Sequence, residues 1–305
     1  MSDGLRRSIE GGSTVVDFGR LMTAMITPFN DQDEIDWEAT GRLIDYLIDE
    51  QKSESLIVCG TTGESPTLSE EEKLQMFDFA VKHAAGRCKI IAGTGSNNTK
   101  HSIQLTQQAA KLGVDGALLV VPYYNKPSQA GMYAHFKAIA EATELPIILY
   151  NVPGRSVVSL SAATTLKLAE IDNIVGTKEC ASIEQVTHIA GHAPEGFRVY
   201  SGDDATCFAA IAVGAYGVIS VASHVAGDEM AGMIQAHLQG DYQHAARMNQ
   251  KLLPLFQGLF ACPDPLPNPA AVKYAMSRRG YGNGNVRLPL LAPSAAERAF
   301  IDALL

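Results

Sequence analysis

Hydrophobic positions recur along the chain in short runs, and most of these runs are followed by an amphipathic stretch. Uninterrupted apolar runs of this length are typical of strands buried on both faces. The stretches between them show helical spacing, with start signals at Asp36, Asn98 and Ser161 and a capping-box pattern from Ser69 to Glu72. The eight predicted strands cover residues 21–26, 56–59, 89–92, 117–121, 147–150, 174–177, 198–201 and 218–221.

Strands that alternate with helices are expected to pair in parallel through right-handed crossovers. Eight such units favour the α/β class and a (β/α)8 TIM barrel, whose usual length is around 250 residues. An open doubly wound sheet is the alternative. It is disfavoured because neither G-x-G-x-x-G nor a P-loop follows the first predicted strand.

Beyond about residue 225 the pattern is helical only. We expect residues 227–238 to form the eighth barrel helix. Helices at 242–260, 269–278 and 294–304 would then form an appended C-terminal layer, interrupted by the proline-rich segment 263–267. The predicted organisation is a disordered leader at 1–16, a catalytic barrel at 17–239 and a C-terminal helical region at 240–305.

Composition narrows the class of protein. Hydrophobic residues make up 46% of the chain and charged residues 19%, which favours a substantial core over disorder. The formal net charge of −9 argues against nucleic-acid and membrane partners, which require a basic surface. Five cysteines, without a C-x-x-C pair, favour free thiols in a reducing compartment such as the cytoplasm. No apolar run reaches membrane-spanning length.

Lys178 stands at the C-terminal end of a predicted buried strand. Burial disfavours the ammonium, lowers its pKa and leaves a free amine that can attack a carbonyl carbon. The structural alternative is a lysine that pairs with Glu179 and has no chemical role.

Active sites of parallel barrels are built from the loops that follow the strands. Tyr150 and Thr61 fall at such positions and would relay protons for an iminium-forming lysine. Thr62 and the backbone N–H groups of the turn 60–63 would hold a substrate carboxylate. Arg155 would bind a second carboxylate.

Each of these positions also has a structural explanation. Tyr123 and Tyr124 suit aromatic packing at a loop or interface, and Arg155 suits a surface salt bridge. For Glu64 we prefer the structural role, a carboxylate that accepts backbone N–H bonds. His188 and His192 have the spacing of a zinc pair but lack a third ligand, so a solvated helix face is expected and no metal is predicted.

Four motifs together resemble one enzyme family. They are Gly60-Thr61-Thr62-Gly63-Glu64-Ser65, Pro122-Tyr123-Tyr124-Asn125, Tyr150-Asn151-Val152-Pro153-Gly154-Arg155 and Lys178-Glu179. The chain resembles the 4-hydroxy-tetrahydrodipicolinate synthases (dihydrodipicolinate synthases) from about residue 19 to residue 291. These enzymes belong to the pyruvate-dependent class I aldolase superfamily, which includes N-acetylneuraminate lyase.

The resemblance implies a lyase that condenses pyruvate with L-aspartate 4-semialdehyde in lysine and diaminopimelate biosynthesis. Lys178 would form the Schiff base, and Tyr150, Thr61 and Tyr124 would carry protons. By the same resemblance, Tyr124 would enter the active site of a neighbouring subunit, in a homotetramer built as a dimer of dimers. No cofactor is implied, because the lysine itself is the electron sink.

The resemblance also assigns substrate contacts. Thr62 and Ile219 would hold pyruvate, and Gly202 would lie near the reacting centre. Arg155 would take the carboxylate of the semialdehyde. Two alternatives stay open: another pyruvate-dependent aldolase such as a sialic acid lyase, which Thr62 and Arg155 disfavour, and a non-catalytic pyruvate-binding relative.

One departure concerns feedback by L-lysine. The regulatory site of lysine-inhibited members is matched here by Ser65, Asn97 and Tyr123. Lys73 stands where that pattern has a histidine, and His101 where it has a glutamate. The loss of a carboxylate and the gain of a cation predict weak or absent inhibition by L-lysine.

Overall fold

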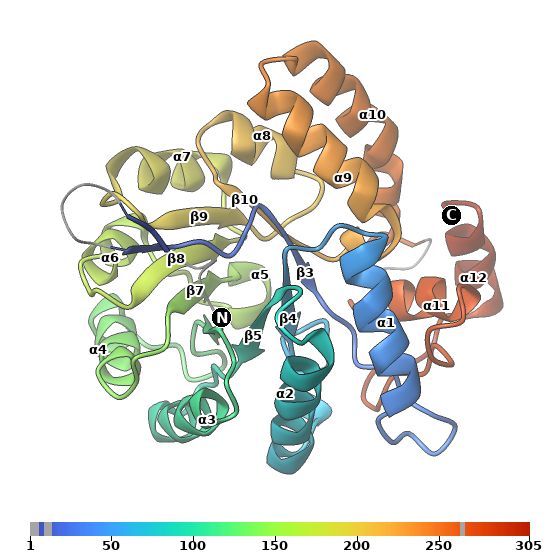
Figure 1. The fold of residues 1–305 in the computed structure, drawn as a ribbon, viewed down its shortest axis with the longest axis horizontal. Helices are drawn as coiled ribbons and strands as arrows, with labels where there is room; N and C mark the ends of the chain where they lie inside the picture. Colours follow the sequence, from blue (N-terminus) through green and yellow to red (C-terminus); the bar gives the residue numbers. More distant parts are fainter. Residues whose placement is uncertain (1–5, 9–13, 263–265) are drawn as a thin grey trace.

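The computed structural model describes residues 6–8, 14–262 and 266–305. Eight strands form a closed barrel in which every neighbouring pair is parallel, so the barrel prediction is confirmed and the open sheet is wrong (Figure 1). The strands follow the order β10-β3-β4-β5-β6-β7-β8-β9. Their bounds are β3 (Leu21–Ala24), β4 (Ser55–Val58), β5 (Lys89–Gly93), β6 (Gly116–Val120), β7 (Ile147–Asn151), β8 (Ile174–Glu179), β9 (Arg198–Ser201) and β10 (Gly217–Ser220).

Helices surround this barrel on its outer side (Figure 1). Their predicted starts are confirmed, because the side chains of Asp36, Ser69, Asn98 and Ser161 each accept a backbone N–H at a helix N-terminus. The helices are α1 (Trp37–Asp49), α2 (Glu70–Ala84), α3 (Thr99–Lys111), α4 (Gln129–Ala140), α5 (Pro153–Ser156), α6 (Ala162–Leu168), α7 (Ile183–His192), α8 (Cys207–Ala212) and α9 (Ser223–Leu238), with a 3-10 turn η1 (Ser65–Thr67).

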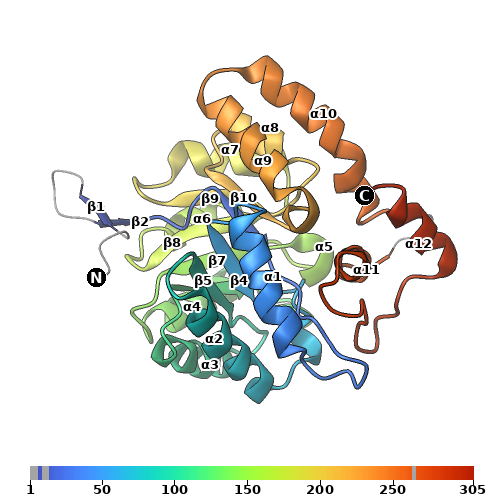
Figure 2. The same ribbon diagram turned by 45° about the vertical axis from the view of Figure 1, so that its right-hand side comes forward.

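The C-terminal helical layer is also present. It consists of α10 (Tyr242–Gly258), α11 (Ala270–Arg278) and α12 (Ala295–Asp302). Figure 2 shows α11 and α12 to one side of the barrel, beyond α1 and α9. Part of the proline-rich segment, residues 263–265, lies outside the described residues.

Several element boundaries differ from the prediction. Helix α9 begins at Ser223 rather than 227, because a first turn joins the regular helix across a kink at Ala226. Strand β8 extends to Glu179, so Lys178 lies within the strand instead of following it. In the expected leader, Arg6–Ser8 (β1) and Thr14–Val16 (β2) pair as an antiparallel two-stranded sheet, while residues 1–5 and 9–13 lie outside the described residues.

The core has an inner and an outer part. Side chains from alternate strand positions fill the barrel, among them Met22, Ile57, Ile91, Ile148 and Ile219. Larger apolar clusters lie between the strands and the helices that cover them. The barrel is therefore packed solid, and chemistry is confined to one end of it.

The five cysteines carry free thiols. Cys59, Cys88, Cys207 and Cys262 are buried, and Cys180 is half-buried. Burial raises the pKa of the Cys59 and Cys88 thiols to about 12, because a thiolate is poorly solvated there.

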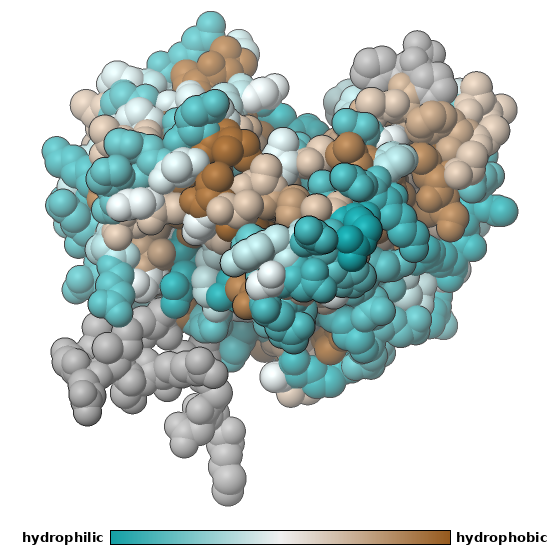
Figure 3. All heavy atoms as spheres, turned by 90° about the horizontal axis from the view of Figure 1, so that it is seen from above, coloured by the Kyte–Doolittle hydropathy of each residue, from teal (hydrophilic) through white to brown (hydrophobic). Residues whose placement is uncertain are grey.

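One face of the molecule, seen from above in Figure 3, is largely hydrophilic with separate hydrophobic patches. In the part of the chain that the structure describes, no helix combines the length and apolarity needed to cross a membrane.

Candidate active site at the mouth of the barrel

Lys178 projects from β8 into the barrel. Its backbone is in register with Tyr150 of β7 on one side and Tyr200 of β9 on the other, so the three side chains belong to one layer of the interior. The ammonium nitrogen lies 4.5 Å from the centroid of the Tyr150 ring. The lysine is 5% exposed, which is exceptional for its residue type. The predicted lysine and tyrosine are therefore brought together.

The surroundings favour the neutral amine. Burial lowers the pKa of Lys178 from its ordinary value, and the positive charge of Arg155 adds to that effect. The carboxyl group of Asp204 works in the opposite direction. Among the described residues Lys178 has no hydrogen bond or ion pair that would stabilise an ammonium. A nucleophilic amine is the expected result.

Glu179 is not the partner of Lys178, so the pairing expected in the structural alternative is wrong. Successive residues of a strand face opposite sides, and Glu179 points out of the barrel into a buried polar network. Its carboxylate accepts bonds from Asn151 Nδ2 at 2.9 Å, Gln185 Nε2 at 2.9 Å and the Ala181 N–H at 2.8 Å. This network joins β7 to β8 directly behind the reactive pair.

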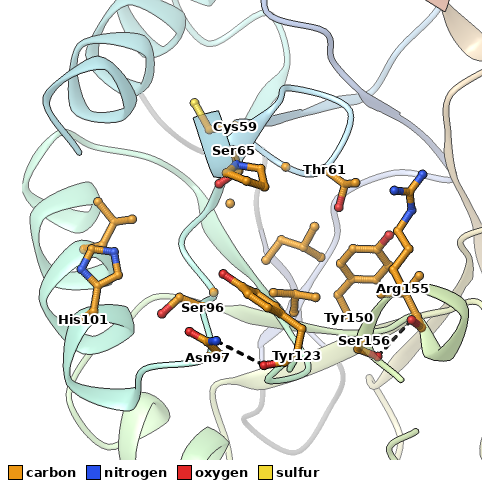
Figure 4. Close-up of a pocket in the computed structure, with 18 of the residues that line it drawn as sticks. Cys59, Thr61, Ser65, Ser96, Asn97, His101, Tyr123, Tyr150, Arg155 and Ser156 are labelled. Atoms are coloured by element: carbon orange, nitrogen blue, oxygen red, sulfur yellow. Dashed lines mark hydrogen bonds between the residues drawn. The ribbon is translucent and has the colours of Figure 1, made fainter. Parts of the chain in front are cut away.

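A cavity of about 550 Å³ opens at this end of the barrel. Thr61, Tyr123, Tyr150 and Arg155 line it (Figure 4). Burial raises the pKa of Tyr150, and the nearby hydroxyl of Thr61 works against that rise. Tyr150 therefore stays protonated at neutral pH and can act as a proton donor, with Thr61 as the next hydroxyl in line.

The loop after β4 carries both predicted threonines. It is a tight turn in which the Ser65 N–H bonds the Gly60 carbonyl at 3.2 Å and the Glu64 N–H bonds the Thr61 carbonyl at 3.1 Å. Thr62 is 2% exposed and lies beside the cavity lining rather than in it. Its hydroxyl accepts a hydrogen bond from Asn268 Nδ2 at 3.0 Å.

Glu64 has the structural role that we preferred. One carboxylate oxygen accepts the Arg287 N–H at 2.9 Å. The other pairs with Lys273 Nζ at 2.6 Å, and both side chains are 1% exposed. The lysine of this pair, 209 positions away, was not anticipated from the sequence.

Arg155 lies on α5 and is exposed at the rim of the cavity. Within the described residues its guanidinium makes no ion pair with an acidic side chain, so the surface salt bridge is not observed. A solvated guanidinium at a cavity rim is suited to binding a carboxylate.

Gly202 follows β9 and faces Lys178. A methyl group built on Gly202 would overlap the Cys180 sulfur and approach Lys178 Cε to 2.9 Å. Ile219, on β10, is 1% exposed and packs in the same interior cluster as Tyr150. Both residues border the reactive pair from inside the barrel, outside the cavity lining.

Tyr124 is the predicted residue that its own chain does not bring to the site. It is 87% exposed, has a positive φ of 72° and is not part of the cavity lining. Tyr123 beside it lines the cavity, and its carbonyl accepts a bond from Asn97 Nδ2 at 3.2 Å (Figure 4).

The residues compared with the lysine-regulatory pattern form the other end of the same cavity. Ser65, Asn97, Lys73 and His101 all line it. Lys73 is half-buried, and burial lowers its pKa. His101 Nδ1 lies 3.5 Å from a carboxylate oxygen of Glu70, and none of the described residues that line the cavity is acidic.

Asp204 and Asn268 were missed from the sequence. Asp204 is 3% exposed, and its Oδ2 accepts the N–H groups of Val221 and Ala222 at 3.1 and 2.8 Å. Its position directly after the predicted strand 198–201 was the available signal. Asn268 had no such signal, because it lies 206 positions from Thr62 in a predicted packing layer.

The histidine pair lies on an exposed face of α7, as expected. His188 and His192 stack on α7 with ring centroids 4.5 Å apart. No group of three or more potential metal-ligating side chains was found in residues 6–8, 14–262 and 266–305.

Comparison with known proteins agrees with this arrangement. The model of the dihydrodipicolinate synthetase family matches residues 17–305. The 4-hydroxy-tetrahydrodipicolinate synthase 1 of Halalkalibacterium halodurans is 51% identical over 288 residues, covering 94% of this chain and 96% of the relative.

Solved structures give the same result. A dihydrodipicolinate synthase from Bacillus anthracis is 48% identical with a TM-score of 0.91, covering 94% of this chain and 97% of that one. A chloride-inhibited dihydrodipicolinate synthase from Acinetobacter baumannii, solved with pyruvate, is 40% identical with a TM-score of 0.90, covering 94% and 98%. The chain belongs to the dihydrodipicolinate synthetase family.

Proposed function

We propose that the chain condenses pyruvate with L-aspartate 4-semialdehyde through a Schiff base on Lys178. The observation that carries this proposal is a buried lysine amine 4.5 Å from the ring of a buried tyrosine, at the mouth of a parallel barrel. The activity named for the relative from Halalkalibacterium halodurans, and the pyruvate held by the one from Acinetobacter baumannii, agree with it.

In this mechanism the Lys178 amine attacks the ketone carbon of pyruvate. Tyr150 and Thr61 move the protons that convert the resulting carbinolamine into an iminium with loss of water. Loss of a methyl proton gives an enamine, which attacks the aldehyde carbon. The substrate amine then attacks the iminium carbon, closes the ring and releases Lys178.

Substrate binding is divided among four residues. Thr62 and Ile219 hold pyruvate, and Gly202, which has no side chain, lets the Lys178 side chain lie close against its backbone beside the reacting centre. Arg155 binds the carboxylate of the semialdehyde, supported by its place at the cavity rim.

A second subunit completes the site. We assign Tyr124 to the proton relay of a neighbouring chain, since it is 87% exposed and lies outside its own cavity. This role requires a dimer at least, and we propose a homotetramer built as a dimer of dimers. Cytoplasmic residence is supported by the five free thiols.

The first test compares turnover of pyruvate with L-aspartate 4-semialdehyde and with N-acetylmannosamine. Turnover with the semialdehyde alone is expected. Activity with the amino sugar alone would identify a sialic acid lyase and remove the role given to Arg155. Inactivity with both would favour the non-catalytic relative.

The second test traps the adduct of pyruvate with borohydride and detects it by mass spectrometry. Lys178→Ala should abolish trapping and lower turnover on the order of 10³-fold or more. Because burial lowers the pKa of Lys178, the trapping rate should level off below pH 10.5, the ordinary lysine value. A rate that levels off only at pH 10.5 or above would contradict a lowered pKa.

A further inference from the structure

A polar contact joins the C-terminal layer to the mouth of the barrel. Asn268 directly precedes Pro269, the residue at the N-terminal cap of α11. Asn268 Nδ2 donates to Thr62 Oγ1 at 3.0 Å. Asn268 is 8% exposed and Thr62 is 2% exposed, so water does not compete for this bond. The contact ends on a residue that we assign to pyruvate.

The chemistry of this bond fixes the direction in which the threonine hydroxyl points. An amide NH₂ group only donates, so the oxygen of Thr62 must accept. The hydroxyl proton of Thr62 is then directed elsewhere and remains available as a donor. A carboxylate only accepts, and it therefore needs a donor of this kind.

We propose that Asn268 is a positioning residue that orients the Thr62 hydroxyl as a donor to the carboxylate of the keto-acid substrate. The proposal rests on the proposed function. It adds that the C-terminal layer, which contributes no reacting group, sets the affinity for the first substrate.

The backbone of the loop does not depend on Asn268. The hydroxyl of Thr27 donates to the Gly63 carbonyl at 2.8 Å, and bonds within the turn hold residues 60–65. The buried pair between Glu64 and Lys273 anchors the same loop to α11. Asn268 is thus left with one function at this loop, the orientation of a side-chain hydroxyl.

Asn268→Asp tests this function because it keeps the shape and replaces the donor by an acceptor. The Thr62 hydroxyl would then donate to the new carboxylate and be lost to the substrate. We expect the pyruvate concentration that half-saturates borohydride trapping to rise at least about tenfold, the scale of one charge-assisted hydrogen bond. The limiting trapping rate should change less than about threefold, since Lys178 and Tyr150 are untouched.

Three comparisons separate positioning from general damage. Asn285→Asp adds the same charge to the same layer at a side chain that makes no hydrogen bond among the described residues, and should leave half-saturation unchanged. Asn268→Ala removes the donor without adding an acceptor, so it should raise half-saturation only a few-fold. Combined with Thr62→Val, Asn268→Asp should have less than a twofold further effect.

The proposal would be overturned if Asn268→Asp left the half-saturating pyruvate concentration unchanged. It would also be overturned if Asn268→Asp raised this concentration as much in the Thr62→Val background as in the unaltered protein. If Asn268→Asp does not fold, the effect of Asn268→Ala, measured with and without Thr62→Val, tests the proposal in the same way. Trapping uses pyruvate alone, so the proposal is testable even if the semialdehyde is not turned over. Failure of the Schiff-base step of the proposed function would appear instead as no trapping in the unaltered protein, and failure of its second substrate as no turnover with the semialdehyde.

Discussion

At the scale of single residues, the site depends on two absences: Glu179 does not pair with Lys178, and Gly202 has no side chain. Under our assignment Lys178 serves as a nucleophile, because burial lowers its pKa and Glu179 faces the other way. The side chain of Lys178, together with that of Cys180, occupies the position that a side chain on Gly202 would take. A buried lysine at this position costs stability, which is a common feature of active sites.

Gly202→Ala should therefore lower activity without removing any reacting group. The added methyl would collide with Cys180 and Lys178, and a displacement of about 1 Å costs on the order of 10²-fold in rate. Gly154→Ala is the matched control, because a methyl there meets nothing within 4 Å. Steady-state turnover and borohydride trapping should both fall for Gly202→Ala alone. Equal activity of the two variants would show that the close packing of Lys178 against Gly202 does not matter for the reaction.

At the scale of elements, α2 and α3 determine which charged side chains line the outer end of the cavity. They place Lys73 and His101 there, where a bound lysine would require an acceptor for its ammonium. The ammonium of a bound lysine would meet Lys73 there instead of a carboxylate. We expect turnover to be unaffected by sub-millimolar L-lysine.

Restoring the pattern of the inhibited enzymes tests this view. The double variant Lys73→His with His101→Glu should gain inhibition, with a half-inhibitory concentration lowered by about tenfold or more. Turnover at rising L-lysine concentrations measures it, and the unaltered protein is the reference. Sub-millimolar inhibition of the unaltered protein would disprove the predicted insensitivity.

Local sequence patterns were sufficient to predict the barrel and to bring Lys178 and Tyr150 together inside it. Apolar runs and helix caps depend on neighbours in sequence, so the eight strands and starts such as Ser69 could be predicted. Strand ends were less accurate, since β8 continues to Glu179 through pairing with β7 and β9. The bond from Asn268 to Thr62 could not be predicted, because no local pattern encodes a contact between positions so far apart.

At the scale of the whole molecule, the single chain is an incomplete catalyst under our assignment of Tyr124. Its exposure and its positive φ present the ring to a neighbouring subunit. A non-glycine residue in that backbone conformation is unfavourable and is retained where the surrounding structure requires it.

Mixing two inactive variants tests this arrangement. Lys178→Ala and Tyr124→Phe should each lower turnover, the second by about 10²-fold or more. Unfolded together and refolded as mixed dimers, they should recover about one quarter of normal turnover, because half of the dimers would contain one intact site. Each variant refolded alone is the control. No recovery in the mixture would place Tyr124 outside the neighbour's site.

The burial of Cys59, Cys88 and Cys207 has a consequence for how this protein is chemically damaged over time. Thiols react with oxidants and alkylating reagents as thiolates, and these three are both shielded and held protonated. Damage at them must wait until the barrel opens. The rate at which these thiols are lost in an oxidising solution would therefore report how often the fold opens.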